Sequence, residues 1–282
     1  MSYKTVLVQV TPLPVATARI ALAAQLAADH DAHLVGTMLT GLATEYYRGG
    51  GAALAGPLPH PALEQIARAG ELALDRFEDQ VRAAGISYER RYSDDEPEVG
   101  LHLQTRYADL LVLGQTDPAD ALLPMLRQLP EALVLKSGRP VLLVPYTGVN
   151  NGTRLDRHAL VAWDGSHAAT RAVTGALPLL QRTAQVTVAV FNPGLAGGAH
   201  GEQPGADLAL YLARHGVAVE VQQHTTGLGL DVGEALLSLA ADLEADLLVA
   251  GAYGHQRWSE LILGGVTRRL LQSTTLPMLL AH

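Results

Sequence analysis

A group of glycines near the C-terminus has the residue types and spacing to bind a phosphate. In the stretch GAYGHQRWSELILGGVTRRLL, Gly251 is followed after two residues by Gly254 and, nine residues later, by Gly264 and Gly265. An apolar run precedes these glycines, and an amphipathic helix is expected to follow them directly. Glycine lets the backbone approach phosphate oxygens, and the N–H groups and positive dipole end of a helix start favour negative charge. The pattern predicts a phosphate-facing loop, to which the Thr267 hydroxyl could add a donor.

The first half of the chain provides an internal comparison for this loop. ADLLVLG at 108–114 recurs as ADLLVAG at 245–251, so that Gly114 corresponds to Gly251. The positions opposite Gly254, Gly264, Gly265 and Thr267 hold Asp117, Arg127, Gln128 and Pro130. Glycines also occur in such turns for purely structural reasons, but a requirement of the fold alone should keep them in both halves. The difference favours a ligand role in the second half.

A carboxylate lies at the start of the second half, in AWDGSHAAT. Asp164 follows an expected strand and precedes an expected helix, beside Gly165 and Ser166. Its carboxylate could accept a hydrogen bond from a ribose hydroxyl or a base edge; alternatively, Asp164 or Ser166 caps the following helix. Thr11 stands opposite Asp164 in the first half, so this feature is also confined to the second half.

Alternating strands and helices are expected to position these residues. Strands are expected near 4–10, 33–39, 86–92, 109–113, 141–145, 158–163, 185–191, 217–222, 246–250 and 277–281, with first-half helices near 16–29, 61–84, 97–107 and 122–136. Most strands are continuous apolar runs, which is typical of parallel strands covered on both faces. The sequence predicts an α/β fold with two tandem, doubly wound, parallel five-stranded sheets, and ligands of such sheets bind beyond the carboxyl ends of the strands.

Composition and missing motifs exclude several classes of protein. The 282 residues include no Cys, which excludes disulfide scaffolds, cysteine nucleophiles and Fe–S clusters. A net charge of −8 without a basic patch argues against binding to nucleic acid or a membrane. Neither a secretory signal nor a membrane-spanning run is visible, so a cytoplasmic location is expected. A P-loop and a nucleophile elbow are also missing, and no metal site is expected, because His30 and His33 lack a third ligand.

With these residues in view, the whole chain resembles a tandem universal stress protein, two domains of that family in one polypeptide. The family motif is Gly, two residues, Gly, nine residues, Gly, then Ser or Thr, and the second half matches it at Gly251, Gly254 and Gly264. The resemblance implies a Rossmann-like fold of the adenine nucleotide alpha hydrolase type. It implies a degenerate domain at 1–147 without the nucleotide motif and a nucleotide-binding domain at 156–282.

The resemblance also implies the ligand and its contacts. Family members with this motif bind ATP or related adenine nucleotides such as AMP, with Mg²⁺ as a further candidate. The candidate binding residues are Asp164, Val190, Gly251, Gly254, His255, Gly264, Gly265, Val266 and Thr267. Asp164 and Val190 would lie against the base and ribose, and the glycine loop against the phosphates. Gly265 stands where Ser or Thr is usual, so one hydroxyl contact is lost and a backbone N–H remains.

Several interpretations stay open at this point. For His255, Arg257, Arg268 and Arg269, phosphate contact and exposure to solvent are both compatible with the sequence. The Gly- and Pro-rich stretch at 40–61 is either a lid or a mobile insertion.

Three functions are compatible with these residues. The favoured one is a nucleotide-binding regulatory protein of the stress response. The alternatives are a nucleotide-independent interaction module with a vestigial glycine loop, and slow ATP hydrolysis with Asp164 placing Mg²⁺ or water. Because no general base accompanies the loop, an enzyme is not expected. The resemblance further implies antiparallel pairing of the last strands, RPVLLVP and LPMLLA, between the two halves, and chains could pair further into homodimers.

Overall fold

The structure is a computed structural model that describes residues 2–42, 60–117, 128–149, 154–195, 203–227, 231–253 and 265–282. Its strands are β1 (Thr5–Gln9), β2 (His33–Leu39), β3 (Tyr88–Ser93), β4 (Leu110–Gly114), β5 (Val141–Val144), β6 (His158–Ala162), β7 (Gln185–Phe191), β8 (Val219–His224), β9 (Leu247–Gly251) and β10 (Met278–Ala281). The helices are α1 (Ala16–His30), α3 (His60–Ala84), α4 (Pro97–Thr105), α5 (Leu129–Lys136), α6 (His167–Leu180), α7 (Ala206–Arg214), α8 (Val232–Asp242) and α9 (Gly265–Ser273), with the 3-10 turn η2 (Pro193–Leu195).

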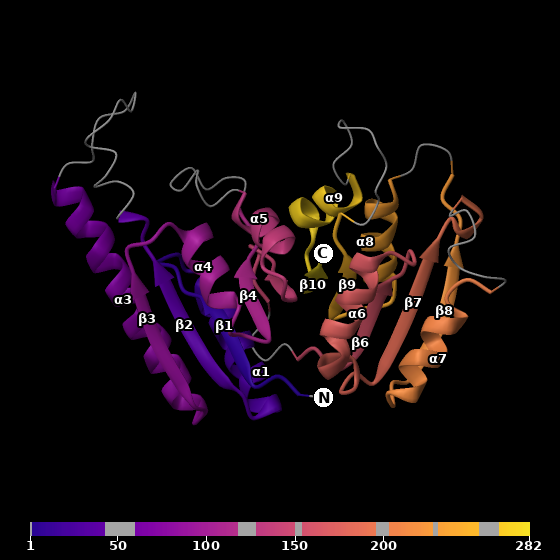
Figure 1. The fold of residues 1–282 in the computed structure, drawn as a ribbon, viewed down its shortest axis with the longest axis horizontal. Coiled ribbons are helices and arrows are strands. Elements are labelled where there is room, and N and C mark those ends of the chain that lie inside the picture. The colour runs from indigo at the N-terminus through magenta and orange to yellow at the C-terminus, as the bar shows by residue number, and fades with distance from the viewer. Residues whose placement is uncertain are drawn as a thin grey trace.

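The described strands form one ten-stranded sheet in the order β3-β2-β1-β4-β5-β10-β9-β6-β7-β8 (Figure 1). Within β1–β5 and within β6–β10 every pairing is parallel, and the two groups have the same strand order. The predicted α/β fold with mostly parallel strands is therefore confirmed. The two groups of strands are joined edge to edge, because β5 and β10 pair antiparallel, with Leu142 opposite Leu279.

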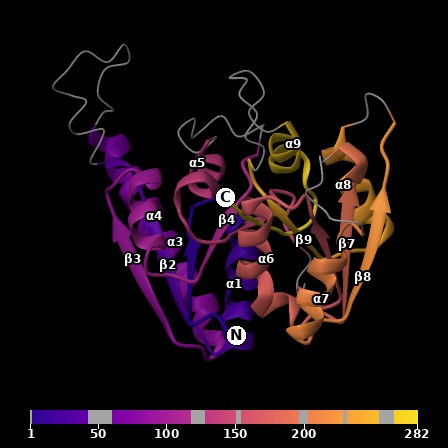
Figure 2. The same ribbon diagram turned by 45° about the vertical axis from the view of Figure 1, so that its right-hand side comes forward.

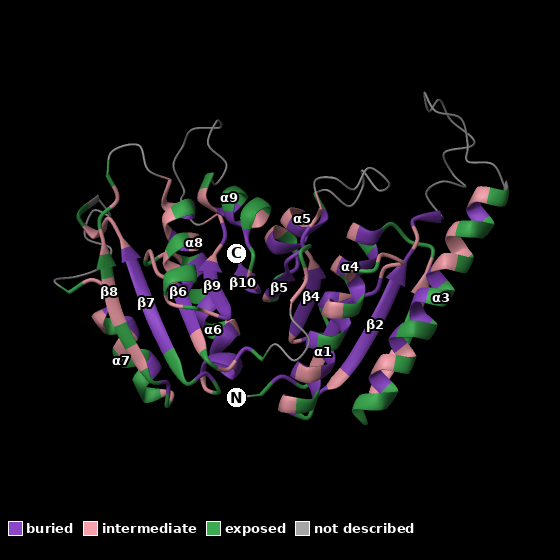
Figure 3. Ribbon diagram, turned by 180° about the vertical axis from the view of Figure 1, so that it is seen from behind, coloured by how far each residue is buried: buried purple, intermediate pink, exposed green. Residues whose placement is uncertain are grey.

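Helices cover both faces of this sheet, as Figures 1 and 2 show. One apolar core contains side chains of α1, α3, α6 and α7, and a second contains side chains of α4, α5, α8 and α9. The central strands are buried on both faces, whereas every residue of the outer strands β3 and β8 is partly buried or exposed (Figure 3). This explains why the central strands are continuous apolar runs and the outer strands are not.

The two outer strands begin two residues later than expected, and their neighbours give the reason. The Leu34 amide donates to the Ser87 carbonyl, and the Val186 amide donates to the Ala218 carbonyl. Strand pairing then starts at Tyr88 and at Val219. The expected helix at 122–136 is described from Leu129 onward, since residues 118–127 lie outside the described part of the chain.

Side-chain contacts reinforce the junction between the two groups of strands. The Tyr3 hydroxyl donates to the Gly175 carbonyl of α6 at 2.7 Å. The buried amide of Gln115 donates to the Leu271 carbonyl of α9 at 3.0 Å and accepts from the Tyr146 amide at 3.0 Å. The residues after β4 are thus connected directly to the helix that follows the glycine loop.

Candidate functional site

The candidate site lies where β6 and β9 end, on adjacent strands. Ala162 of β6 is opposite Ala250 of β9, so Gly251, the last residue of β9, and Asp164, two residues beyond β6, lie at the same edge of the sheet on neighbouring strands. Of the predicted residues, Gly254, His255 and Gly264 fall at 254–264, outside the described residues, as does Arg257. The structure therefore gives the two ends of the glycine loop and the elements that anchor them.

The side chains of Asp164 and Ser166 stabilise the start of α6 by hydrogen bonds to the backbone. Ser166 is the N-cap, and its hydroxyl accepts from the Ala169 amide at 3.1 Å. The Asp164 carboxylate accepts from the Ser166 amide at 3.0 Å across the turn at Gly165, whose φ of +75° is readily adopted by glycine. The capping interpretation thus holds for Ser166, while the half-buried Asp164 is held in a fixed orientation at the end of β6.

Gly251 has a packing role that the sequence comparison did not reveal. A Cβ on Gly251 would lie 2.3 Å from the Ala169 nitrogen and 2.7 Å from the Ala168 carbonyl carbon. The backbone of β9 therefore contacts the first turn of α6 directly. At the corresponding Gly114 a Cβ would instead lie 2.0 Å from Nη1 of Arg19. Each half needs glycine here, but the two glycines make room for different groups.

The far end of the loop enters α9 at Gly265, with Val266 and Thr267 in its first turn. A Cβ on Gly265 would meet no atom of the described residues within 4 Å, so none of them requires glycine at this exposed position. The buried Thr267 hydroxyl accepts from the Tyr253 amide at 3.2 Å. This hydrogen bond ties the start of α9 to the residue that follows β9 by two positions, and it fixes the distance that the loop has to span.

Tyr253 was not singled out in the sequence but lies at the centre of this arrangement. Its backbone adopts a φ of +58°, which is uncommon for a residue other than glycine. Burial and then the neighbouring Glu131 carboxylate of α5 raise the pKa of the Tyr253 phenol well above its ordinary value, so it stays protonated. An aromatic residue two positions after a strand was the available signal.

Arg269 and Val190 both contact other described elements. Arg269 pairs with Asp231 at 3.3 Å and with Glu234 at 3.1 Å, both at the start of α8, whereas Arg268 is exposed. Val190 lies near the carboxyl end of β7, but its side chain is fully buried, and a Cβ on Gly205 would lie 3.1 Å from its Cγ2. Val190 therefore packs in the core beside α7.

Asn192 follows β7 at the same end of the sheet and was not predicted as a site residue. Its amide nitrogen donates to the Thr226 hydroxyl at 2.8 Å, and its amide oxygen accepts from the Thr226 backbone nitrogen at 2.9 Å. These two hydrogen bonds connect the segments that follow β7 and β8. An Asn directly after an apolar strand was the signal that could have found it.

Comparison with known proteins identifies the second half. Residues 157–282 match the Universal stress protein family. No curated protein matches the sequence. A universal stress protein from Archaeoglobus fulgidus DSM 4304 has a similar structure, with a TM-score of 0.70 at 16% identity over 98% of this chain and 97% of that one. A putative universal stress protein from Pseudomonas aeruginosa UCBPP-PA14 gives 0.56 at 15% identity, over 99% and 93%. A universal stress protein in complex with cAMP, 23% identical, covers 52% of this chain and 99% of its own, with a TM-score of 0.37.

These matches confirm the resemblance seen in the sequence. The C-terminal half is a universal stress protein domain, and the likeness to full-length structures extends its fold across both halves. Among the described helices, none is long and apolar enough to cross a membrane.

Proposed function

We propose that this protein is an adenine-nucleotide-binding regulatory protein of the stress response, which takes ATP or AMP in its C-terminal half. The observation that carries the proposal is the meeting of Asp164, the Gly251 end of the loop and the start of α9 at the carboxyl ends of two adjacent parallel strands. Open parallel sheets bind ligands at this edge. The family match of residues 157–282 supports the same conclusion.

The described residues offer complementary contacts to such a ligand. The Asp164 carboxylate is suited to accept from ribose hydroxyls. The backbone N–H groups of Gly265 and Val266 lie in the first turn of α9, where helix amides lack a partner within the helix and attract anions. None of the described residues would touch a Cβ on Gly265, which leaves room on their side for a phosphate to approach closely. Mg²⁺, if bound, would depend mainly on the phosphates, since Asp164 is the sole carboxylate among the candidate residues.

The remaining parts of the proposal concern the molecule as a whole. We place the protein in the cytoplasm, with the first half as a partner that does not bind nucleotide and is held against the second half through β5 and β10, and with homodimers as a further level of assembly. The candidate set contains no evident general base, so binding without catalytic turnover is the function we propose.

Isothermal titration calorimetry with ATP and AMP, on the wild type and on Asp164→Asn, tests the proposal. The amide oxygen of Asn can still accept from the Ser166 nitrogen, so the turn should persist while the charge is lost. Hydrogen bonds to charged groups contribute about 1.5–3 kcal/mol, which predicts at least a ten-fold weaker affinity in the variant.

Asp94→Asn is the matched control, because Asp94 in the first half also accepts one hydrogen bond, from the Thr40 hydroxyl at 3.0 Å. It should bind as the wild type does. If the wild type binds neither nucleotide at millimolar concentration, the nucleotide proposal is wrong. An interaction partner captured equally well with and without nucleotide would then favour the interaction-module alternative.

A further inference from the structure

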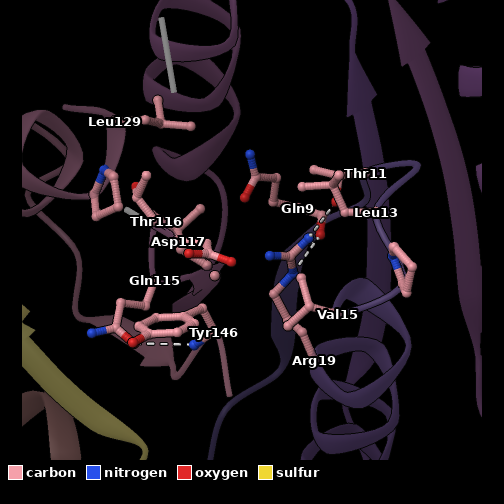
Figure 4. A pocket seen from close by; sticks show the side chains of 14 residues that line it. Gln9, Thr11, Leu13, Val15, Arg19, Gln115, Thr116, Asp117, Leu129 and Tyr146 are labelled. Atoms are coloured by element: carbon pink, nitrogen blue, oxygen red, sulfur yellow. Dashed lines mark hydrogen bonds between the residues drawn. The ribbon is translucent and has the colours of Figure 1, made fainter. Parts of the chain in front are cut away.

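The half without the glycine motif contains a cavity of about 340 Å³ at the carboxyl ends of β1 and β4 (Figure 4). This volume is within the range of small-molecule sites. Its walls are largely apolar, with Leu13, Val15, Leu113, Leu129, Pro130 and Tyr146 among the lining residues. Polar groups of Gln9, Thr11, Gln115 and Thr116 add to the lining. Such an apolar pocket with a few convergent polar groups has the character of a binding site.

A buried arginine side chain lines this cavity. Arg19 of α1 is 3% exposed and lines the cavity, and Figure 4 shows its guanidinium beside Gln9 and Thr11, facing Asp117 across the space. Its Nε donates to the Gln9 carbonyl at 2.9 Å and its Nη2 to the Thr11 hydroxyl at 3.2 Å. Within the described part of the chain, no carboxylate is ion-paired with it. A guanidinium has five N–H donors, so donors remain for a ligand.

Holding this charge without an ion pair is costly to the fold. Burial lowers the pKa of Arg19 to about 10. Replacing a buried ionic group by an apolar one of similar volume is often neutral or stabilising. Gly114 nevertheless leaves open the space that Nη1 of Arg19 occupies, since a Cβ there would lie 2.0 Å from it. The arrangement is therefore better suited to an incoming negative charge than to stability alone.

The surroundings favour a carboxylate over a phosphate. Pro130, in the first turn of α5, has no N–H, and Glu131 adds negative charge at the same helix start. At the start of α1, the Ala16 and Thr17 amides already donate to the Leu13 and Pro14 carbonyls. The described residues of the cavity thus do not form the cluster of backbone N–H groups that phosphates prefer, whereas a planar guanidinium matches a carboxylate through two parallel hydrogen bonds.

We propose that the N-terminal half binds a small organic carboxylate, whose carboxyl group meets the Arg19 guanidinium and whose hydrocarbon part lies against Leu13, Val15, Leu129 and Pro130. The site is independent of the nucleotide proposed for the C-terminal half. It makes the first half a second ligand-binding unit of different specificity.

Titration of the full chain with butyrate, succinate and citrate tests this, with butyramide and inorganic phosphate as comparison probes. The Nε–H resonance of Arg19, followed by two-dimensional NMR, should shift saturably with at least one carboxylate and should not shift with butyramide. Arg19→Met, which keeps the side-chain length without the charge, should weaken that affinity at least ten-fold, as seen by calorimetry. The exposed Arg214→Met in α7 is the matched control and should bind as the wild type does.

A second variant keeps the experiment decisive if Arg19→Met fails to fold. Gly114→Ala retains the charge but displaces the end of a flexible side chain, and it should weaken carboxylate binding while ATP affinity is unchanged. The proposal is overturned if no carboxylate binds at tens of millimolar, or if phosphate binds more tightly than every carboxylate. Equal affinity in the wild type and both cavity variants would also overturn it.

Discussion

Gly265 is the position at which the nucleotide hypothesis can be tested most sharply, because substitutions there would change the ligand contact without displacing any described residue. In the described part of the chain, no atom lies within 4 Å of a Cβ built on this exposed first residue of α9. Serine is the better helix former by roughly 0.5 kcal/mol, so Gly265→Ser should not lower stability. A regained hydroxyl contact of about 0.5–1.5 kcal/mol predicts a two- to twelve-fold tighter affinity for ATP.

Two further substitutions at Gly265 separate the hydroxyl from other effects. Gly265→Ala adds the Cβ and the helix propensity without a donor, so its ATP affinity should equal that of the wild type. Gly265→Asp places a negative charge that suits the helix dipole by about 0.3–1 kcal/mol, but the charge repels a phosphate. It should therefore unfold no earlier than the wild type in urea and yet bind ATP at least ten-fold more weakly. Calorimetry with equal affinities for the Ser and Ala variants, or with no loss in the Asp variant, would refute the reasoning.

Two other predictions concern stability. Gly251→Ala should lower the free energy of unfolding by about 1–3 kcal/mol or more, because its Cβ would lie 2.3 Å from the Ala169 backbone nitrogen. Gly114→Ala should lower it less, because the atom displaced there is the end of the Arg19 side chain. Urea titration of both variants measures the two losses, and equal losses would contradict the packing argument. Burial and then Arg182 lower the pKa of His30, so the unfolded chain takes up the proton first as the pH falls below about 6.5, and stability should decrease there. Urea midpoints measured across that range should fall less steeply for His30→Gln, and an unchanged slope would exclude His30 as the cause.

The strands and helices were predictable because their apolar runs and amphipathic patterns are local properties of the sequence. The antiparallel register of Leu142 and Leu279 depends on two segments far apart in the chain, so strand periodicity alone could not give it. The predicted role of Gly251 was incomplete for a similar reason. The first half keeps a glycine at the same position to accommodate Arg19, and this requirement becomes visible when α1 and β4 are brought together.

Side-chain direction is a second property that the sequence alone does not give. Val190 was placed correctly near the end of a strand, but which face it presents depends on the strand's register and on α7, against which it is buried. Arg269 could equally have faced the loop until α8 supplied Asp231 and Glu234 as partners. Arg19 gave no signal in the sequence, because an arginine in an Ala-rich amphipathic helix is usually exposed to solvent.

The β5–β10 pairing fixes the stoichiometry of two unlike units. When such units are separate polypeptides, like can pair with like through the exposed edge strand, and the mixture of pairs depends on expression levels and protein concentration. A covalent link makes the local concentration of the unlike neighbour far higher than that of any other chain. Each molecule then carries one glycine-loop half and one Arg19 half at any dilution. The two halves can therefore diverge in sequence while their one-to-one pairing is kept.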